Sequence, residues 1–187
     1  MEDLPAEIES VLLTEQQIHQ KVGELAAAVS ADYVDREVLA VGVLKGSFVF
    51  MADLVRQLTV PVMVDFMAVS SYGDSTTSSG NVRIIKDLDG SVEDRHVLFV
   101  EDIVDSGVTL GYLTDNLRSR GAASIQTCAL LDKPGRRALE FAPDYVGFTI
   151  PDEFVVGYGL DYAERYRGLP FVAVLKRQVY MDPLPPL

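Results

Sequence analysis

Apolar residues recur along the chain in two spacings, which predict alternating strands and helices. Short continuous apolar runs such as 38–44, 96–100 and 124–132 are typical of buried strands. Between such runs, apolar residues fall three and four positions apart, which is the spacing of a helix face. The predicted strands are residues 38–44, 62–69, 81–88, 96–100, 124–132, 143–151 and 171–175, and the predicted helices are residues 14–29, 48–58 and 110–117. This alternation predicts an α/β fold built on a parallel sheet.

The ends of two helices carry sequence signals of their own. Residues 14–17, Thr-Glu-Gln-Gln, form a capping-box pattern at the start of the first helix. Its predicted buried face is Ile18, Val22, Leu25, Ala26 and Val29. His19 lies on or beside that face, where a surface or core-edge position is expected rather than a catalytic one. Gly121 supplies a stop for the helix that contains Leu110, Leu113 and Leu117.

Two polar segments interrupt this pattern. Residues 70–80 contain no apolar side chain except the ring of Tyr72, and strand-like sequence resumes at once after them. We therefore expect residues 70–81 to be a flexible excursion that serves as a lid, rather than a linker between domains. Residues 182–187 are too rich in proline for a helix or a central strand and are expected to be frayed. With no internal repeat and no linker, residues 1–187 are expected to form a single domain.

Composition narrows the classes of function. The 187 residues include 48% apolar residues and carry a net charge of −12, which disfavours nucleic acid and anionic membranes as partners. No apolar stretch approaches the length of about 20 residues that a membrane span requires, and the amino terminus is acidic where a secretory signal is basic. Cys128 is the single cysteine and is expected to be a small buried hydrophobic residue. With only two histidines, the chain has little material for a zinc site or a Cys–His pair, and we expect a cytoplasmic protein.

The stretch 100–110 joins a predicted buried strand to a predicted helix and carries most of the candidate chemistry. Glu101 and Asp102 stand at the carboxyl end of the strand, and Asp105 opens the loop. Residues 106–109 then lie where backbone N–H groups and hydroxyls converge at a helix start, an arrangement that attracts phosphate. The carboxylates suit sugar hydroxyls or a metal ion. An ordinary turn with surface acids is the alternative, and the combination of acids with Ser-Gly-Val-Thr makes it the weaker one.

This stretch resembles the ribose-phosphate binding motif of the purine phosphoribosyltransferases. Four further stretches match the hypoxanthine-guanine phosphoribosyltransferases: residues 71–73, Lys133, residues 150–162 and residues 165–167. The resemblance extends from about residue 10 to about residue 180. It implies a type I phosphoribosyltransferase fold, with a Rossmann-like parallel-sheet core, a flexible lid loop and a small hood.

The resemblance also implies a reaction and its partners. The expected activity is purine salvage, in which 5-phosphoribosyl passes from phosphoribosyl pyrophosphate to N9 of hypoxanthine or guanine. The products are IMP or GMP and pyrophosphate. Mg²⁺ is the implied cofactor, because it bridges diphosphate oxygens and requires few protein ligands. A homodimer or homotetramer is implied, with no nucleic-acid or membrane partner.

The resemblance assigns the phosphate-binding residues by position. Those implied to bind phosphoribosyl pyrophosphate are Glu101, Asp102, Asp105, Ser106, Gly107, Val108 and Thr109. Those implied to bind pyrophosphate are Leu44, Lys45, Gly46 and Arg167, with a cis peptide between Leu44 and Lys45. The implied magnesium ligands are Asp161, Glu101 and Asp102, and the implied lid residues are Ser71 and Tyr72. Taken alone, Lys45 in its Gly-Ser turn reads equally as a surface lysine.

The resemblance assigns the purine-binding residues in the same way. Asp105 is implied as the catalytic base that faces purine N7, a role that suits a carboxylate. Lys133 is implied to donate to the 6-oxo group, which discriminates against 6-amino purines. Phe154 is implied to stack on the base and the Val155 backbone to read its far edge, with Asp161 also in the purine site. Without the resemblance, Phe154 reads as core and Lys133 as a surface residue, and Asp161 could simply cap a turn.

Two departures from the family pattern affect the expected purine preference. Asp132 precedes Lys133 where an apolar or basic residue is expected, so we expect it to compensate part of the lysine charge. Glu153 stands where some members carry a basic residue beside the stacking aromatic. Xanthine therefore stays open as a substrate, whereas Lys133 argues against adenine. A nucleotide-sensing regulator that binds RNA or DNA is the alternative of another class, but the acidic first forty residues make a poor nucleic-acid arm.

Overall fold

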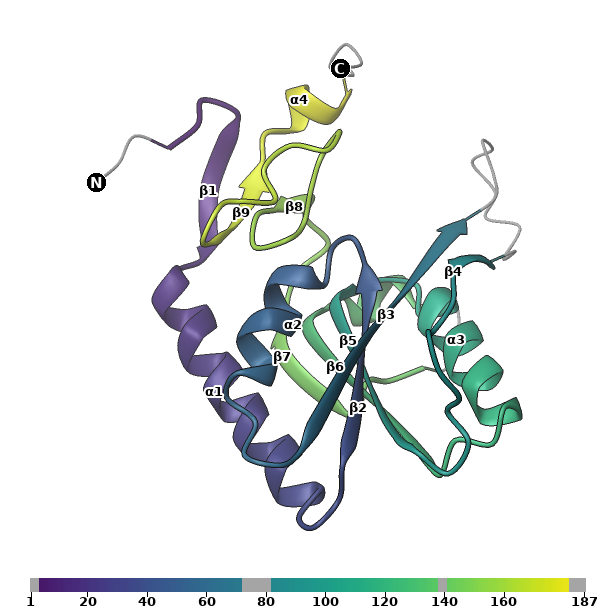
Figure 1. Ribbon diagram of the computed structural model, residues 1–187. Coiled ribbons are helices and arrows are strands. Elements are labelled where there is room, and N and C mark those ends of the chain that lie inside the picture. Colours follow the sequence, from purple (N-terminus) through teal and green to yellow (C-terminus); the bar gives the residue numbers. More distant parts are fainter. Residues whose placement is uncertain (1–3, 72–81, 138–140, 182–187) are drawn as a thin grey trace.

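The computed structural model describes residues 4–71, 82–137 and 141–181. Its centre is a six-stranded sheet in the order β4-β3-β2-β5-β6-β7. β2 (Val38–Leu44), β3 (Val62–Ser71), β5 (His96–Val104), β6 (Ser124–Asp132) and β7 (Tyr145–Thr149) are parallel, and only β4 (Val82–Lys86) runs antiparallel to its neighbour. The sheet confirms the predicted α/β fold (Figure 1).

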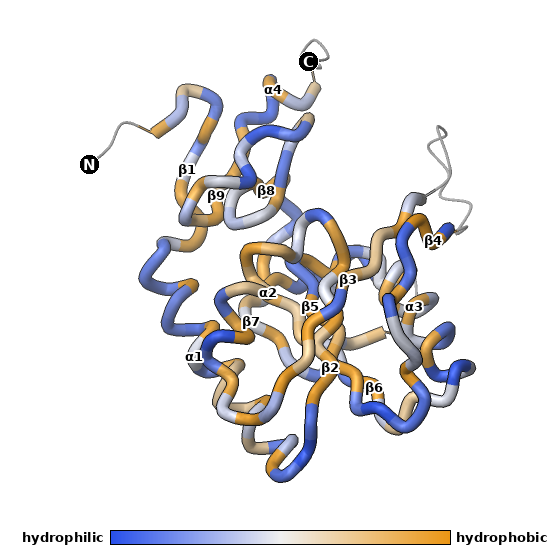
Figure 2. The backbone as a smooth tube through the Cα atoms, in the orientation of Figure 1, coloured by the Kyte–Doolittle hydropathy of each residue, from blue (hydrophilic) through white to orange (hydrophobic). Residues whose placement is uncertain are grey.

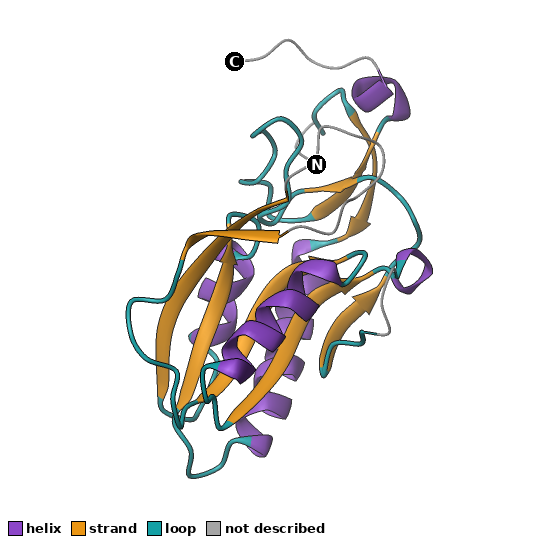
Figure 3. Cartoon of the chain, turned by 90° about the vertical axis from the view of Figure 1, so that its right-hand side faces the viewer, coloured by secondary structure: helices purple, strands orange, loops and turns teal. Residues whose placement is uncertain are grey.

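Helices cover both faces of this sheet. α1 (Glu15–Asp32) and α2 (Phe48–Val55) pack on one face, against a cluster that includes Leu98 and Val100. α3 (Val108–Ser119) packs on the other face, against a cluster that includes Val97 and Phe99. The strands are therefore apolar on both faces, because alternate side chains point to opposite layers. Figure 2 shows hydrophobic stretches along these strands, and Figure 3 shows helices in front of and behind them.

A second, smaller sheet lies beyond the carboxyl ends of the parallel strands (Figure 1). Its order is β1-β9-β8, and all its pairs are antiparallel. β1 (Ile8–Leu13) comes from the start of the chain, whereas β8 (Val155–Val156) and β9 (Val172–Leu175) come from its end. With the short helix α4 (Arg177–Met181), this sheet forms the expected small hood. The hood places the carboxyl-terminal loops over the edge of the sheet where the candidate residues lie.

Most predicted elements are confirmed, with several changes of boundary. The capping box is present, since Thr14 accepts from the Gln17 backbone and Gln17 binds back to the Thr14 backbone. β5 runs past the predicted end at residue 100 to Val104, α2 ends at Val55 rather than residue 58, and β7 is shorter than the predicted 143–151. β1, the 3₁₀ turn η1 (Pro134–Arg136) and α4 were not predicted. Cys128 is buried and has a free thiol, as expected.

The predicted lid and tail are only partly described. Ser70 and Ser71 belong to β3, because the ladder with β4 pairs them with Arg83 and Val82. β3 therefore extends into the first two residues of the predicted lid, residues 70–81. The rest of the lid, residues 72–81 with Tyr72, and the tail 182–187 lie outside the described residues. Within the described ranges, no helix combines the length and apolar character needed to cross a membrane.

Candidate functional site

Three segments meet at the carboxyl edge of the sheet, and two glycines let them meet. A Cβ on Gly46, in the turn after β2, would lie 1.8 Å from the Asp102 Oδ2 atom of β5. A Cβ on Gly159, in the hood, would lie 2.1 Å from the backbone oxygen of Gly46, and Gly159 has a φ of +100°. Only glycine allows these approaches at both positions. The peptide between Leu44 and Lys45 is cis, as the resemblance implied.

The two strand acids occupy a buried, mutually repelling environment. Glu101 and Asp102 are consecutive in β5, so their side chains leave opposite faces of the sheet. Asp102 is 8% exposed, and burial raises its pKa to about 6. Burial, and then the Asp102 charge, raise the pKa of Glu101 well above its usual value. Among the described residues, Glu101 Oε2 has no hydrogen-bond partner. A buried acceptor of this kind suits a ligand hydroxyl or a cation.

The loop between β5 and α3 forms a small cavity. Gly107, with a φ of +78°, is the N-cap of α3. Residues from β5, the loop and the first turn of α3 enclose about 100 Å³: Glu101, Ile103, Val104, Asp105, Ser106, Gly107, Thr109 and Leu110. The first N–H groups of a helix have no partner within the helix, so this cavity offers donors and a favourable dipole to an anion. Five of the seven residues predicted to bind phosphoribosyl pyrophosphate thus line this cavity, and Asp102 and Val108 do not.

Three of the predicted pyrophosphate residues, Lys45, Gly46 and Arg167, lie where the turn after β2 meets the hood. Arg167, from the hood, donates through Nη1 to the Gly159 backbone oxygen at 2.8 Å. Its Nη2 atom lies 2.9 Å from Asp161 Oδ1, and Asp161 Oδ2 accepts from the Glu164 backbone N–H at 2.9 Å. Lys45 Nζ is 3.1 Å from each carboxylate oxygen of Glu164. Asp161 therefore does stabilise a turn, while it also faces an arginine of the predicted site. Glu164 was not predicted.

Of the predicted purine residues, Lys133 follows the end of β6 and contacts the segment just before Phe154 and Val155, whereas Asp161 lies with Arg167. Lys133 is 7% exposed and donates through Nζ to the Glu153 backbone oxygen at 2.5 Å, and it lies 3.7 Å from Asp152 Oδ1. The expectation that Asp132 compensates Lys133 is wrong, because Asp132 pairs with Arg137. Neighbouring residues of an extended chain point to opposite sides, so Asp132 and Lys133 do not face each other.

Phe154 does not belong to the hydrophobic core, and its ring contacts two tyrosines. Its ring is 37% exposed and stacks on Tyr180 of α4, with a centroid separation of 4.8 Å and an interplanar angle of 18°. Tyr162 contacts it edge to face at 5.6 Å. Val155 is buried in β8, where it pairs with Val174. The sequence offered no sign of Tyr180, because a five-residue helix has too little periodicity to be recognised.

Asp105 has an arginine neighbour that sequence reasoning missed. Arg136 of η1 places Nε 3.2 Å from Asp105 Oδ1 and Nη1 3.3 Å from Asp152 Oδ1. Arg137 donates to the Asp105 backbone oxygen at 3.0 Å. The pair Arg136–Arg137 follows Lys133 closely in sequence, so its basic character was visible, but its partners were not. The two arginines connect the loop between β5 and α3, through Asp105, with the segment just before Phe154, through Asp152.

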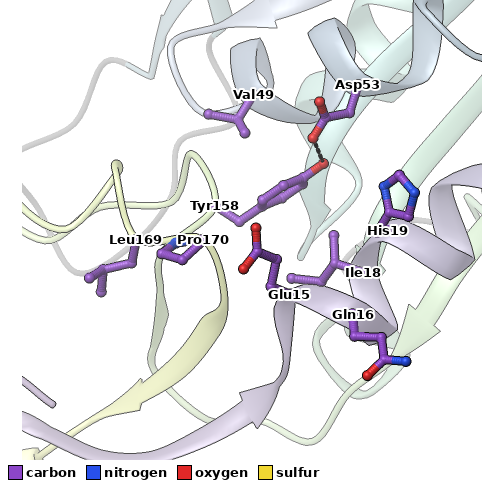
Figure 4. A pocket seen from close by; sticks show the side chains of 9 residues that line it. All are labelled: Glu15, Gln16, Ile18, His19, Val49, Asp53, Tyr158, Leu169 and Pro170. Carbon is purple, nitrogen blue, oxygen red and sulfur yellow. Dashed lines mark hydrogen bonds between the residues drawn. The ribbon is translucent and has the colours of Figure 1, made fainter. Parts of the chain in front are cut away.

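A larger cavity, of about 600 Å³, lies away from these residues. Figure 4 shows it between the start of α1, the α2 helix and the hood, with Glu15, His19 and Tyr158 among its lining side chains. Tyr158 donates to Asp53 at 2.6 Å. None of the predicted site residues that the structure describes lines this cavity, so its larger size does not mark it as the site of the predicted chemistry. His19 is exposed at its edge, as expected of a non-catalytic position.

The candidate magnesium ligands provide few metal-binding oxygen atoms by themselves. In the described ranges, no group of three or more His, Cys, Asp or Glu side chains could hold a metal ion. Asp102 and Asp161 are nevertheless close enough for the charge of Asp161 to raise the pKa of Asp102. Glu101 adds an acceptor without a partner. Such a set fits a Mg²⁺ ion that takes most of its ligands from substrate oxygens and water.

Comparison with known proteins places the chain in one family. Residues 10–163 match the family described as the phosphoribosyl transferase domain. The chain is 56% identical to the hypoxanthine-guanine phosphoribosyltransferase of Bacillus subtilis, over 93% of this chain and 97% of that protein. It is 50% identical to the enzyme of the same name from Streptococcus agalactiae, over 95% and 98%. Among solved structures, a hypoxanthine phosphoribosyltransferase from Staphylococcus aureus superposes with a TM-score of 0.90, at 48% identity, over 93% of this chain and 95% of that one.

Proposed function

Because the chain belongs to the phosphoribosyltransferase family, we propose that it is a purine salvage enzyme, a hypoxanthine-guanine phosphoribosyltransferase. It transfers 5-phosphoribosyl from phosphoribosyl pyrophosphate to N9 of hypoxanthine or guanine, and it yields IMP or GMP and pyrophosphate. The family match covers most of the chain, and relatives with this name are similar over nearly their whole length. The structural observation that carries the proposal is the cavity at the start of α3, which Glu101 and Asp105 line together with residues of the first helix turn.

The cavity at the start of α3 is the proposed binding site of the phosphoribosyl group. Its 5-phosphate is held by the backbone N–H groups of residues 106–109 and by the hydroxyls of Ser106 and Thr109. Glu101 and Asp102 accept from the ribose hydroxyls, directly or through a cation. Burial raises the pKa values of both acids, because it removes water from their charged forms. Hydrogen bonds from the ribose hydroxyls offset this desolvation, because they stabilise the carboxylate form.

The diphosphate lies over the turn after β2. The amides of Lys45 and Gly46, the Lys45 ammonium and the Arg167 guanidinium offer donors to its oxygens. Asp161, Glu101 and Asp102 would hold Mg²⁺, and a bound ion would supply positive charge opposite the leaving pyrophosphate. These groups stabilise negative charge as the bond from C1′ to the diphosphate oxygen breaks.

The purine is held and deprotonated on the other side of the sugar. Asp105 accepts the proton from N7 while the new bond forms between N9 and C1′. Lys133 donates to the 6-oxo group that hypoxanthine and guanine share, and the Val155 backbone meets the far edge. One face of Phe154 is covered by Tyr180, so the base stacks on what remains exposed. Xanthine also carries a 6-oxo group and is the alternative substrate.

The remaining proposals concern the lid, the oligomeric state and the cellular location. Residues 70–81, with Ser71 and Tyr72, are proposed to close over the reaction centre, which excludes water from the sugar cation. We propose a homodimer or homotetramer, which light scattering on the purified protein would distinguish from a monomer. A cytoplasmic location accords with a lone free cysteine, Cys128.

A panel of free bases tests the proposal directly. The purified protein is incubated with phosphoribosyl pyrophosphate, Mg²⁺ and one base, and pyrophosphate and the nucleotide product are measured together. Hypoxanthine and guanine are expected to give stoichiometric product, and adenine is expected to give little. Absence of pyrophosphate release with every 6-oxo purine would refute the assignment. Turnover with xanthine alone would replace the substrate while keeping the reaction.

A further inference from the structure

Glu164 occupies the position of an anion between the two side-chain cations of the proposed pyrophosphate site. Both of its carboxylate oxygens lie 3.1 Å from Lys45 Nζ, although the two residues are 119 positions apart in sequence. The same carboxylate lies 3.4 Å from Arg167 Nη2. A carboxylate that joins a lysine and an arginine in this way makes the contacts that a phosphate oxygen pair would make.

The backbone of the hood holds this carboxylate in place. Ala163, Glu164 and Tyr166 have φ values of +50°, +61° and +75°, a region that side chains rarely adopt. The turn is closed by a hydrogen bond from the Glu164 N–H to Asp161 Oδ2, at 2.9 Å, and by a backbone pair between Tyr162 and Arg165. Non-glycine residues in such a conformation cluster at functional sites. The turn thereby fixes Glu164 above Lys45.

The negative charge of Glu164 makes it a competitor of a diphosphate for Lys45 and Arg167. Both oxygens of the Glu164 carboxylate face the Lys45 ammonium, and a glutamate side chain carries a negative charge at neutral pH. A diphosphate brings its own negative charge to the same two cations, and like charges at this distance repel. The diphosphate therefore binds only as Glu164 gives up its contacts with Lys45 and Arg167.

We propose that Glu164 sets the affinity of the pyrophosphate site, as an internal counter-ion that substrate diphosphate and product pyrophosphate must displace. The proposal rests on the proposed function for the identity of the site. It implies that Glu164 weakens the binding of phosphoribosyl pyrophosphate and of pyrophosphate alike, and so favours release of the product. A residue that merely oriented the two cations would have the opposite effect, because its loss would weaken binding.

Direct binding of inorganic pyrophosphate at fixed free Mg²⁺ tests whether Glu164 weakens or strengthens the binding of pyrophosphate. In Glu164→Gln, the dissociation constant measured by calorimetry is expected to fall by about threefold to tenfold at low salt, because two exposed ion pairs no longer compete. The gain should shrink as salt is added. Glu37→Gln is the matched control, since Glu37 is exposed just before β2, at the far end of the strand from Lys45. Glu164→Asp keeps the charge and should stay within about twofold of wild type.

A double-mutant cycle shows whether the effect acts through Lys45. In a Lys45→Met background, the gain from Glu164→Gln should fall to less than half of its value on a logarithmic scale. An unchanged or weaker affinity in Glu164→Gln, or a gain equal to that of Glu37→Gln, would overturn the proposal. So would a full gain in the Lys45→Met background. Because binding is measured without turnover, these outcomes do not depend on which purine the enzyme accepts, and the assay with free bases tests that separately.

Discussion

Replacing Asp102 by asparagine should remove a loss of stability that grows between acid and neutral pH, while it weakens the site. Burial raises the pKa of Asp102 from an ordinary value of 3.8 to about 6. Between these two pH values the folded chain binds more protons than the unfolded chain, so stability falls as the pH rises. A pKa difference of this size corresponds to about 3 kcal/mol of lost stability above the folded-state pKa. Asparagine has no charge to desolvate and avoids this loss.

Two neighbouring effects modify the size of the gain. The Asp102 charge helps to raise the pKa of Glu101, so its removal also eases the ionisation of Glu101. Against this, the amide nitrogen of the introduced asparagine is buried and needs an acceptor, and a missing one costs about 1–3 kcal/mol. That cost does not depend on pH. The informative quantity is therefore the difference between variant and wild type as a function of pH, rather than the difference at one pH.

Urea denaturation from pH 4.5 to 7.5, without ligand and with chelator, measures this difference. The free energy of unfolding of Asp102→Asn, relative to wild type, is expected to increase by about 2–3 kcal/mol across the range. Asp115→Asn is the control, because Asp115 lies exposed on α3, where it pairs with Arg118. A difference between Asp102→Asn and wild type that stays constant with pH would refute the reasoning. The Michaelis constant for phosphoribosyl pyrophosphate should rise in Asp102→Asn only.

Three further substitutions separate the proposed roles. Asp105→Asn should lower turnover by about 10²–10⁴-fold with a much smaller change in the Michaelis constant for phosphoribosyl pyrophosphate; near-wild-type turnover would leave Asp105 a structural residue. Lys133→Ala should weaken the use of hypoxanthine and guanine by comparable factors in steady-state kinetics, and a loss confined to guanine would show that Lys133 does not bind the 6-oxo group. Asp161→Ala should raise the Mg²⁺ concentration needed for half-maximal activity, and an unchanged magnesium titration would remove Asp161 from the metal site.

The order of strands and helices was readable from the sequence, because it depends on local spacing. Val97 and Phe99 alternate with Leu98 and Val100 in one apolar run, and the structure buries the two pairs under helices on opposite faces. The phosphate loop was readable for the same reason, since strand, loop and helix are contiguous in residues 96–119. β1 escaped notice because a short strand of a small sheet lacks clear alternation, and its partner β9 lies at the other end of the chain.

The sequence alone therefore determined the fold class and indicated a phosphate site between β5 and α3, and its family resemblance supplied the candidate residues of the purine and diphosphate sites. The tertiary structure decided which charges meet. Glu164 faces Lys45, Arg136 faces Asp105, and Asp132 turns to Arg137 instead of Lys133. Hydrophobic periodicity acts along the chain within a few residues, so neighbours in sequence carry its signal. An ion pair acts between side chains that only the packing of distant elements brings within about 4 Å, so its partners become visible only in the folded protein.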